Sequence, residues 1–235
     1  EKLVFAYQSS GQLVRAADEI MRADEGESPS WDQQLRAAEL YHKAEAHARR
    51  NRIYVAWLNR DSAAADSESH IRNQTLRQRL VLDDVEPRRY RIELVERELA
   101  SQWHSEDTLA WAGRAAIVLG AEESERFADV PLQIPLAESL ARKQAALSAA
   151  RERLSQAEKL IGEGARSEIL FRRAELYRVM AQDLMTSEAP ANLSDLEATQ
   201  YRMLLEEEAY PFEEKAIDLH ARNHQRLAEG RFDEW

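Results

Sequence analysis

Two histidines near the carboxyl end of the sequence come closest, by type and spacing, to a site that could do chemistry. His220 and His224 in "HARNH" are four positions apart, so on a helix their rings would share a face and could bind a metal ion. The zinc-peptidase pattern requires Glu directly after the first His, but Ala221 stands there. A metal-binding or enzymatic helical bundle that uses these residues is one hypothesis. The simpler interpretation is two partly exposed histidines on a polar helix face.

The acidic stretch "LLEEEAYPFEEKA" is a second group that could do chemistry, as an acid/base pair or as a set of cation ligands. Glu206, Glu207 and Glu208 are consecutive, and Glu213 and Glu214 follow. Because neighbouring helical positions point in different directions, these carboxylates do not converge on one point. They indicate a solvated acidic face. The functional alternative is an acidic groove that attracts a basic segment of a partner.

Other chemical signatures are missing from the sequence. It contains no glycine-rich phosphate loop, no GxSxG motif and no Cys, so we expect neither enzymatic activity nor a cofactor. Nine arginines lie near Tyr54, Trp57 and Tyr90 and could form a basic patch, although such side chains more often cover apolar surface with their stems. They are Arg49, Arg50, Arg52, Arg72, Arg77, Arg79, Arg88, Arg89 and Arg91.

Composition points to a helical protein that does not bind nucleic acid. The 235 residues include only 7 Gly and 6 Pro beside 44% hydrophobic and 32% charged residues, which favours helix and argues against broad disorder. The formal net charge of -11 opposes binding to a phosphate backbone. No apolar run has the length of a membrane span. We therefore expect a soluble chain without a transmembrane segment.

The spacing of apolar residues predicts helices along almost the whole chain. Ser30 followed by Gln33 has the form of a capping box, Ser194 or Asp195 is the expected N-cap of a later helix, and Pro87 should end one helix or begin another. The expected segments are a helix over 3–23, one from 31, one over 88–103, one over 106–119 capped by Gly120, one over 136–161 ended by "GEG", one over 167–185, one over 196–209, one from Pro211 to about 229, and the start of an unfinished helix in "RFDEW".

One stretch predicts a division of the chain. "DVPLQIP" at 129–135 holds two prolines four positions apart, which an uninterrupted helix does not tolerate. We place the boundary there. The N-terminal domain, 1–130, would hold irregular helical hairpins, and the C-terminal domain, 131–235, would hold further hairpins with a truncated last repeat.

A four-residue string occurs twice and suggests a repeat. "AELY" is found at Ala38–Tyr41 and again at Ala174–Tyr177, about four times the roughly 34-residue period of a helical repeat array apart. These positions resemble those of the tetratricopeptide repeat, in which a small residue lets the partner helix approach and a Tyr three residues later fills the space between helices. The repeats are degenerate, since Arg173 stands where a large apolar residue is usual.

The resemblance extends to other small residues. Ala209 and Ala216 resemble the small positions of a second repeat helix, and Gly113 with Gly120 resemble a first helix and its turn. The stretches "EEAYPFEEKAIDLHARN" and "EGRFDEW" are similar to bacterial cell-envelope tetratricopeptide proteins, including ones associated with adventurous gliding motility. The residues that the resemblance assigns to packing between repeats are Ala38, Tyr41, Gly113, Ala174, Tyr177, Ala209 and Ala216.

The resemblance implies an all-α protein, a right-handed α-solenoid of antiparallel helical hairpins, whose concave face holds a segment of a partner protein. Arg173 and Asn223 are the candidate partner-binding residues. The expected partners are other envelope proteins, and the expected location is the periplasm or cell envelope. A structural spacer that self-associates through its last repeat, forming a homo-oligomer, is the remaining alternative.

Overall fold

The chain folds into helices. The computed structural model describes residues 2–22, 29–60, 64–230 and 235, and within these ranges it contains helices and no strand. This confirms the all-α class. The chain divides into two compact units, residues 1–108 and residues 109–235. None of the helices in the described ranges combines the length and the apolar character that crossing a bilayer requires.

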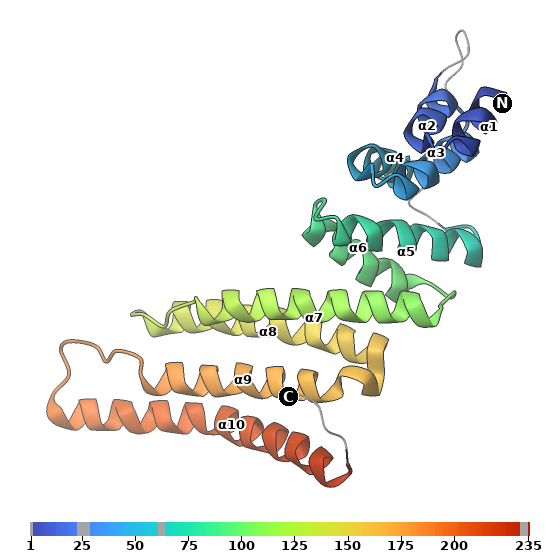
Figure 1. Cartoon of the computed structure of the whole chain (residues 1–235). Coiled ribbons are helices and arrows are strands. Elements are labelled where there is room, and N and C mark those ends of the chain that lie inside the picture. Colours follow the sequence, from blue (N-terminus) through green and yellow to red (C-terminus); the bar gives the residue numbers. More distant parts are fainter. Residues whose placement is uncertain (1, 23–28, 61–63, 231–234) are drawn as a thin grey trace. The chain divides into compact units, whose positions relative to one another are not determined.

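In the first unit each helix packs on the next one along the chain (Figure 1). A cluster of buried apolar side chains joins the first helices and includes Ala17, Ala38, Tyr54 and Leu80. The helices are α1 (Lys2–Ser9), α2 (Leu13–Met21), α3 (Trp31–Lys43), α4 (His47–Arg60), α5 (Ser67–Leu82) and α6 (Pro87–Ala100).

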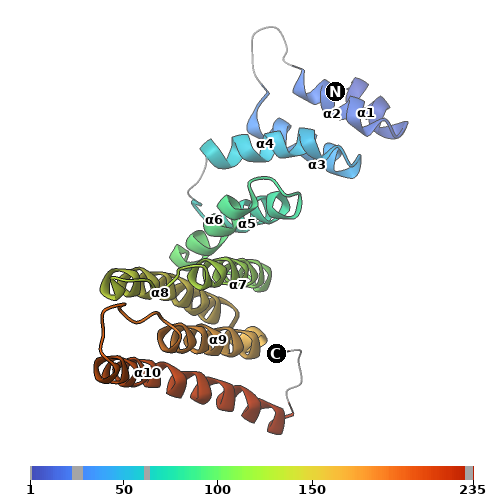
Figure 2. The ribbon, with the colours of Figure 1, turned by 90° about the vertical axis from the view of Figure 1, so that its left-hand side faces the viewer.

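The second unit contains longer helices. Helix α7 begins at the last residues of the first unit and continues into the second, where Gly113 and Gly120 lie directly against side chains of α8. Helix α9 packs on both α8 and α10, and two views show α9 and α10 side by side (Figures 1 and 2). The elements are α7 (Glu106–Ala128), α8 (Leu136–Ile161), a 3₁₀ turn (Gly162–Ala165), α9 (Arg166–Met185) and α10 (Asp195–Ala228).

Several predicted helix ends are confirmed. Ser30 and Gln33 form the expected capping box at the start of α3, and Pro87 is the first residue of α6. Helix α8 ends at Ile161, directly before the glycines of "GEG". The expected helix in "RFDEW" falls largely on residues 231–234, which lie outside the described residues.

Three predicted helix boundaries are wrong. The single helix over 3–23 is two helices, because Gly11 adopts a left-handed φ of 73° and the chain turns there. Gly120 does not end a helix. It lies inside α7, where an added Cβ would stand 2.8 Å from Leu154 Cδ2, so this glycine serves close helix packing. Pro211 lies inside α10. It is exposed, so the carbonyl that it cannot bond is able to face water.

The double-proline stretch connects α7 to α8 inside the second unit, whereas the boundary between the units falls between Thr108 and Leu109. A fully buried lysine holds this connection together. Lys143 Nζ donates to the carbonyl oxygens of Phe127 at 3.2 Å and Val130 at 2.7 Å and pairs with Asp183 of α9. Its ammonium group therefore binds one carbonyl in the last turn of α7 and one just beyond it, which keeps the turn packed on the unit.

A buried carboxylate has the same role in the first unit. Glu98 of α6 is fully buried, and its oxygens accept hydrogen bonds from His70 Nε2 at 2.8 Å, Gln74 Nε2 at 2.8 Å, His104 Nδ1 at 2.9 Å and Thr108 Oγ1 at 2.9 Å. Burial alone would raise the pKa of Glu98, but these four hydrogen bonds hold it below its usual value. Glu98 thus joins α5, α6 and the start of α7.

We expect Glu98→Gln to lower the free energy of unfolding by about 2 kcal/mol at pH 7, because it removes charge-assisted hydrogen bonds from a buried site. A carboxyl with a depressed pKa stabilises the fold above its unfolded-state pKa and loses that contribution as the pH falls through its folded-state value. The difference in the free energy of unfolding between wild type and variant should therefore become smaller at pH values below 4.5, the ordinary Glu pKa. Urea unfolding followed by circular dichroism at pH 7 and pH 4 measures both effects. The exposed neighbour Glu96 supplies the control Glu96→Gln. An equal loss at both pH values would contradict the assignment.

We expect Gly113→Ala to destabilise the protein by about 1 to 3 kcal/mol, although Ala normally favours helix over Gly. The added Cβ would lie 2.8 Å from Ile161 Cγ1 and 2.9 Å from Ile161 Cβ, so α7 and α8 would have to separate. At Gly164 an added Cβ meets nothing within 4 Å, so Gly164→Ala is the matched control. Thermal unfolding of both variants checks this, and a Gly113→Ala variant as stable as wild type would show that the contact is not tight.

Candidate partner-binding surface

Helix α10 begins at a well-defined cap. Ser194 is its N-cap: its Oγ accepts from the backbone N of Glu197, while Glu197 Oε2 accepts from the backbone N of Ser194 at 2.8 Å. This capping box fixes the first turn. Of the two N-caps expected from the sequence, Ser194 and Asp195, Ser194 is the one that caps the helix.

One face of α10 packs on α9. Leu205, Ala209 and Ala216 are buried on this face, and the ring of Phe212 lies 6.3 Å from that of Tyr177 of α9. The two alanines let the helix backbones approach closely. This inner face fixes which side of α10 is turned away from α9.

The opposite face of α10 exposes a row of apolar side chains, which we call the outer stripe: Leu196, Met203, Tyr210 and Ile217. They are 69%, 57%, 61% and 69% exposed. Their spacing of seven residues places them on one side of the helix with a drift of about 20° per step. Leu204 is also exposed, but it points about 100° away from Met203 and is not part of the stripe. These side chains stand about 10.5 Å apart along the helix axis, so they form a row of separate apolar groups rather than one continuous patch. Their recurrence on one side of the helix indicates an interaction surface.

Carboxylates flank the outer stripe on both sides, and we call them the acidic rim. On a helix of 3.6 residues per turn, Glu206 and Glu213 follow one edge of the stripe, while Glu207 and Glu214 follow the other. Asp218 lies farther round the helix and pairs with Arg222 at 3.7 Å. All but Glu213 are exposed, and Glu213 is half-buried.

The single cation between Glu206 and Asp218, a stretch that the structure describes in full, is Lys215. Its Nζ lies 5.6 Å from the ring centre of Tyr177 and 5.9 Å from that of Phe212. Lys215 therefore faces α9, and the rim keeps its negative charge.

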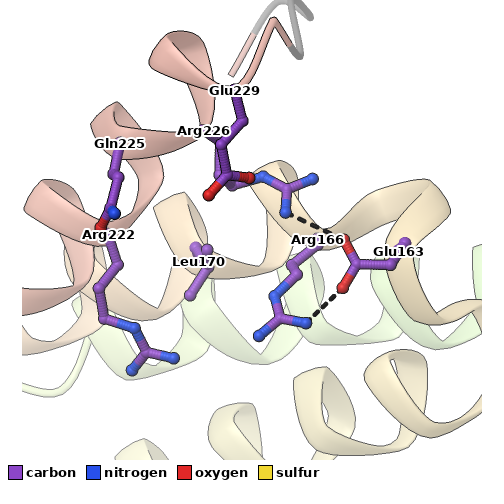
Figure 3. A pocket seen from close by; sticks show the side chains of 7 residues that line it. All are labelled: Glu163, Arg166, Leu170, Arg222, Gln225, Arg226 and Glu229. Atoms are coloured by element: carbon purple, nitrogen blue, oxygen red, sulfur yellow. Dashed lines mark hydrogen bonds and ion pairs between the residues drawn. The ribbon is translucent and has the colours of Figure 1, made fainter.

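A cavity of about 340 Å³ lies between the start of α9 and the end of α10 (Figure 3). In this view the carboxylate of Glu163 lies between two arginines: it accepts from Arg166, and from Arg226 Nη1 at 3.1 Å. Arg226 Nε also donates to Ser167 Oγ at 3.0 Å. The hydrogen bonds from Arg226 and Arg166 lower the pKa of Glu163. These charges bind one another across the two helices, so the cluster fastens the end of α10 to α9.

The residues predicted to pack between repeats are all buried in the structure. Tyr41 in addition donates from its Oη to Asp18 Oδ1 at 2.6 Å, and burial followed by this hydrogen bond raises the pKa of Tyr41 to about 12. Nothing in the spacing of the sequence indicates Asp18 as a partner. The buried residues are Ala38, Tyr41, Gly113, Ala174, Tyr177, Ala209 and Ala216.

The two predicted partner-binding residues contact other parts of this chain. Arg173 donates to Glu158 Oε2 at 2.7 Å and to Ser155 Oγ at 3.0 Å, which links α9 to α8. Asn223 is buried, and its Nδ2 donates to the backbone oxygen of Trp235 at 2.9 Å. Binding of a partner by Arg173 and Asn223 stays a prediction.

The two histidines of "HARNH" lie in different surroundings. His220 Nε2 is 3.3 Å from Glu175 Oε1, and its ring lies against Phe171, whereas His224 is exposed. In the part of the chain that the structure describes, no group of three or more His, Asp or Glu side chains is placed to hold a metal ion.

The arginines near the aromatic residues mostly stack inside the first unit. The Arg72 guanidinium lies 4.9 Å from the ring centre of Trp57, and Arg89 lies 5.1 Å from that of Tyr90. Arg50 and Arg77 are buried. These guanidinium groups thus lie over aromatic rings of the first unit.

The outer stripe was not predicted from the sequence, because its seven-residue spacing becomes apparent only when α10 is known to be continuous through Pro211. Comparison of the chain with family models, with curated proteins and with solved structures finds no match. The function must therefore be argued from the geometry of the molecule itself.

The two faces of α10 should respond oppositely to substitution. We expect Ile217→Ser to change the free energy of unfolding by less than about 0.5 kcal/mol because the side chain is exposed. Ala216→Leu, one position earlier, should cost about 1 to 3 kcal/mol because it overpacks the contact with α9. Urea unfolding measures both. A large loss in Ile217→Ser would mean that the stripe is covered within the molecule.

Proposed function

We propose that the protein is a non-catalytic scaffold that binds a segment of a partner protein. The observation that carries the proposal is the outer stripe of α10, an apolar surface that nothing in the described residues covers. Burying such a row of side chains on a partner releases about 25 cal/mol for each Å² of apolar surface removed from water, which gives a partner a reason to bind there.

The finer features of the proposal come from the sequence resemblance. We propose that the helices continue one another as tetratricopeptide-like hairpins in a right-handed α-solenoid, and that the scaffold acts with other proteins of a bacterial periplasm or cell envelope. Buried small residues at Ala38, Ala174 and Ala209 support helical hairpins of this kind. The outer stripe, which we propose as the interaction surface, lies on a single helix, α10, and a hairpin array of this kind can present one helix in this way.

The test is an affinity capture from bacterial envelope extract with the whole chain as bait. We expect one or two defined proteins to be retained by wild type and reduced at least tenfold by the double variant Met203→Glu with Ile217→Glu, since a charge in the stripe cannot be buried on an apolar partner. Leu82, which is exposed in the first unit, supplies the control Leu82→Glu.

The control bait should retain the same proteins as wild type. Capture that is equal for all three baits would show that the stripe does not bind the partner. If wild type retains no protein above a bait-free resin, the scaffold proposal is wrong.

A further inference from the structure

We propose that the partner of the outer stripe is a basic amphipathic helix, with apolar residues in a heptad pattern and Lys or Arg beside them. This inference rests on the proposed function and names the chemistry of the partner. It follows from three features of α10: the period of the stripe, its length, and the sign of the charge along its edges.

The period of the stripe favours a helix over a strand as the occupant. Seven residues of α-helix rise about 10.5 Å, so Leu196, Met203, Tyr210 and Ile217 present apolar groups at that interval. A partner helix with a heptad repeat presents its own apolar groups at the same interval. Side chains on one face of a strand recur at about 6.8 Å, which does not match.

The length of the stripe sets the size of the segment. From Leu196 to Ile217 the helix axis rises about 32 Å, which three heptads of a partner helix would cover. Helix α10 is continuous over this range, with Ser194 as its cap and the Glu163–Arg226 ion pair at its far end. The surface is therefore preformed, and binding does not have to order it.

The negative charge of the acidic rim indicates that the partner is positively charged. Glu206 and Glu213 on one side, and Glu207 and Glu214 on the other, have no ion pair or hydrogen bond with any residue that the structure describes. In a helix pair the residues that flank the apolar seam meet those of the partner, and opposite charges there select partner and orientation. Lys or Arg at these places would neutralise the rim.

A second copy of this chain fits the stripe poorly. Two α10 helices packed seam to seam would bring acidic rim against acidic rim, since the sole cation of the segment between Glu206 and Asp218, Lys215, faces α9. Like charges next to one another at an interface are unfavourable. The same rim repels a surface of anionic lipid headgroups.

The experiment uses two synthetic helical peptides of three heptads each, with Leu at the seam positions. One peptide carries Lys at the flanking positions and the other carries Glu. Isothermal titration calorimetry with the whole chain should show the Lys peptide binding at least twentyfold more tightly than the Glu peptide. Because the attraction is screened by salt, raising NaCl from about 50 to 500 mM should lower the affinity of the Lys peptide by about tenfold.

Charge reversal at the rim provides the matched variants. Glu207→Lys with Glu214→Lys brings the summed charge of the four rim positions to zero and should remove the preference, so that the two peptides bind about equally tightly. Glu39→Lys with Glu96→Lys changes two exposed carboxylates elsewhere and should leave the preference unchanged. Failure of the Lys peptide to bind wild type, equal binding of both peptides to wild type, or an unchanged preference in the rim variant would overturn the inference.

Two further outcomes separate this inference from the proposed function. If the envelope capture still depends on Met203 and Ile217 but the Lys peptide does not bind, the scaffold proposal is kept and the inference of a basic partner helix is wrong. Light scattering that shows a dimer dissolved by Ile217→Glu would assign the stripe to a second copy and would also overturn the inference.

Discussion

The one-sided packing of α10 on α9 is the constraint on which the functional surface depends. Ala209 and Ala216 let the two helices approach closely, and Arg226 fastens the far end by bonding Ser167 and Glu163. Because this contact occupies one face, the side chains half a turn away must face outward. The apolar stripe is thus exposed as a consequence of how the helix is held, and α10 presents it over several turns because the helix continues through Pro211.

Buried charges organise the rest of the fold at the connections between helices. Glu98 gathers donors from α5 and from the start of α7, and Lys143 binds the carbonyls at the end of α7 together with Asp183 of α9. A buried charge is tolerated only when it is paired and hydrogen-bonded. Each group therefore fixes a turn that apolar packing alone would leave variable.

Local signals in the sequence predicted local structure well. Ser30, Pro87 and Ser194 begin helices because capping and proline effects act within a few residues. The predictions at Gly120 and Pro211 were wrong because the outcome at each depends on what lies nearby in space. A leucine of α8 fills the room that a side chain at Gly120 would need, and Pro211 is exposed, so no packed neighbour forces the helix to end there. The partners of Glu98 and Lys143 were unpredictable for the same reason, and the outer stripe became visible only with a continuous α10.

The most direct test of this account uses the absence of Cys from the sequence, which lets single cysteines report on the two faces of α10. Cysteines replacing Met203, Tyr210 and Ile217 should react with a maleimide as fast as an exposed thiol. Cysteines replacing Ala209 and Ala216 should react about a hundredfold more slowly, since labelling requires local opening, and the Lys peptide should protect only the first three. Slow labelling at the outer positions in the isolated chain, or fast labelling at the inner ones, would contradict the account.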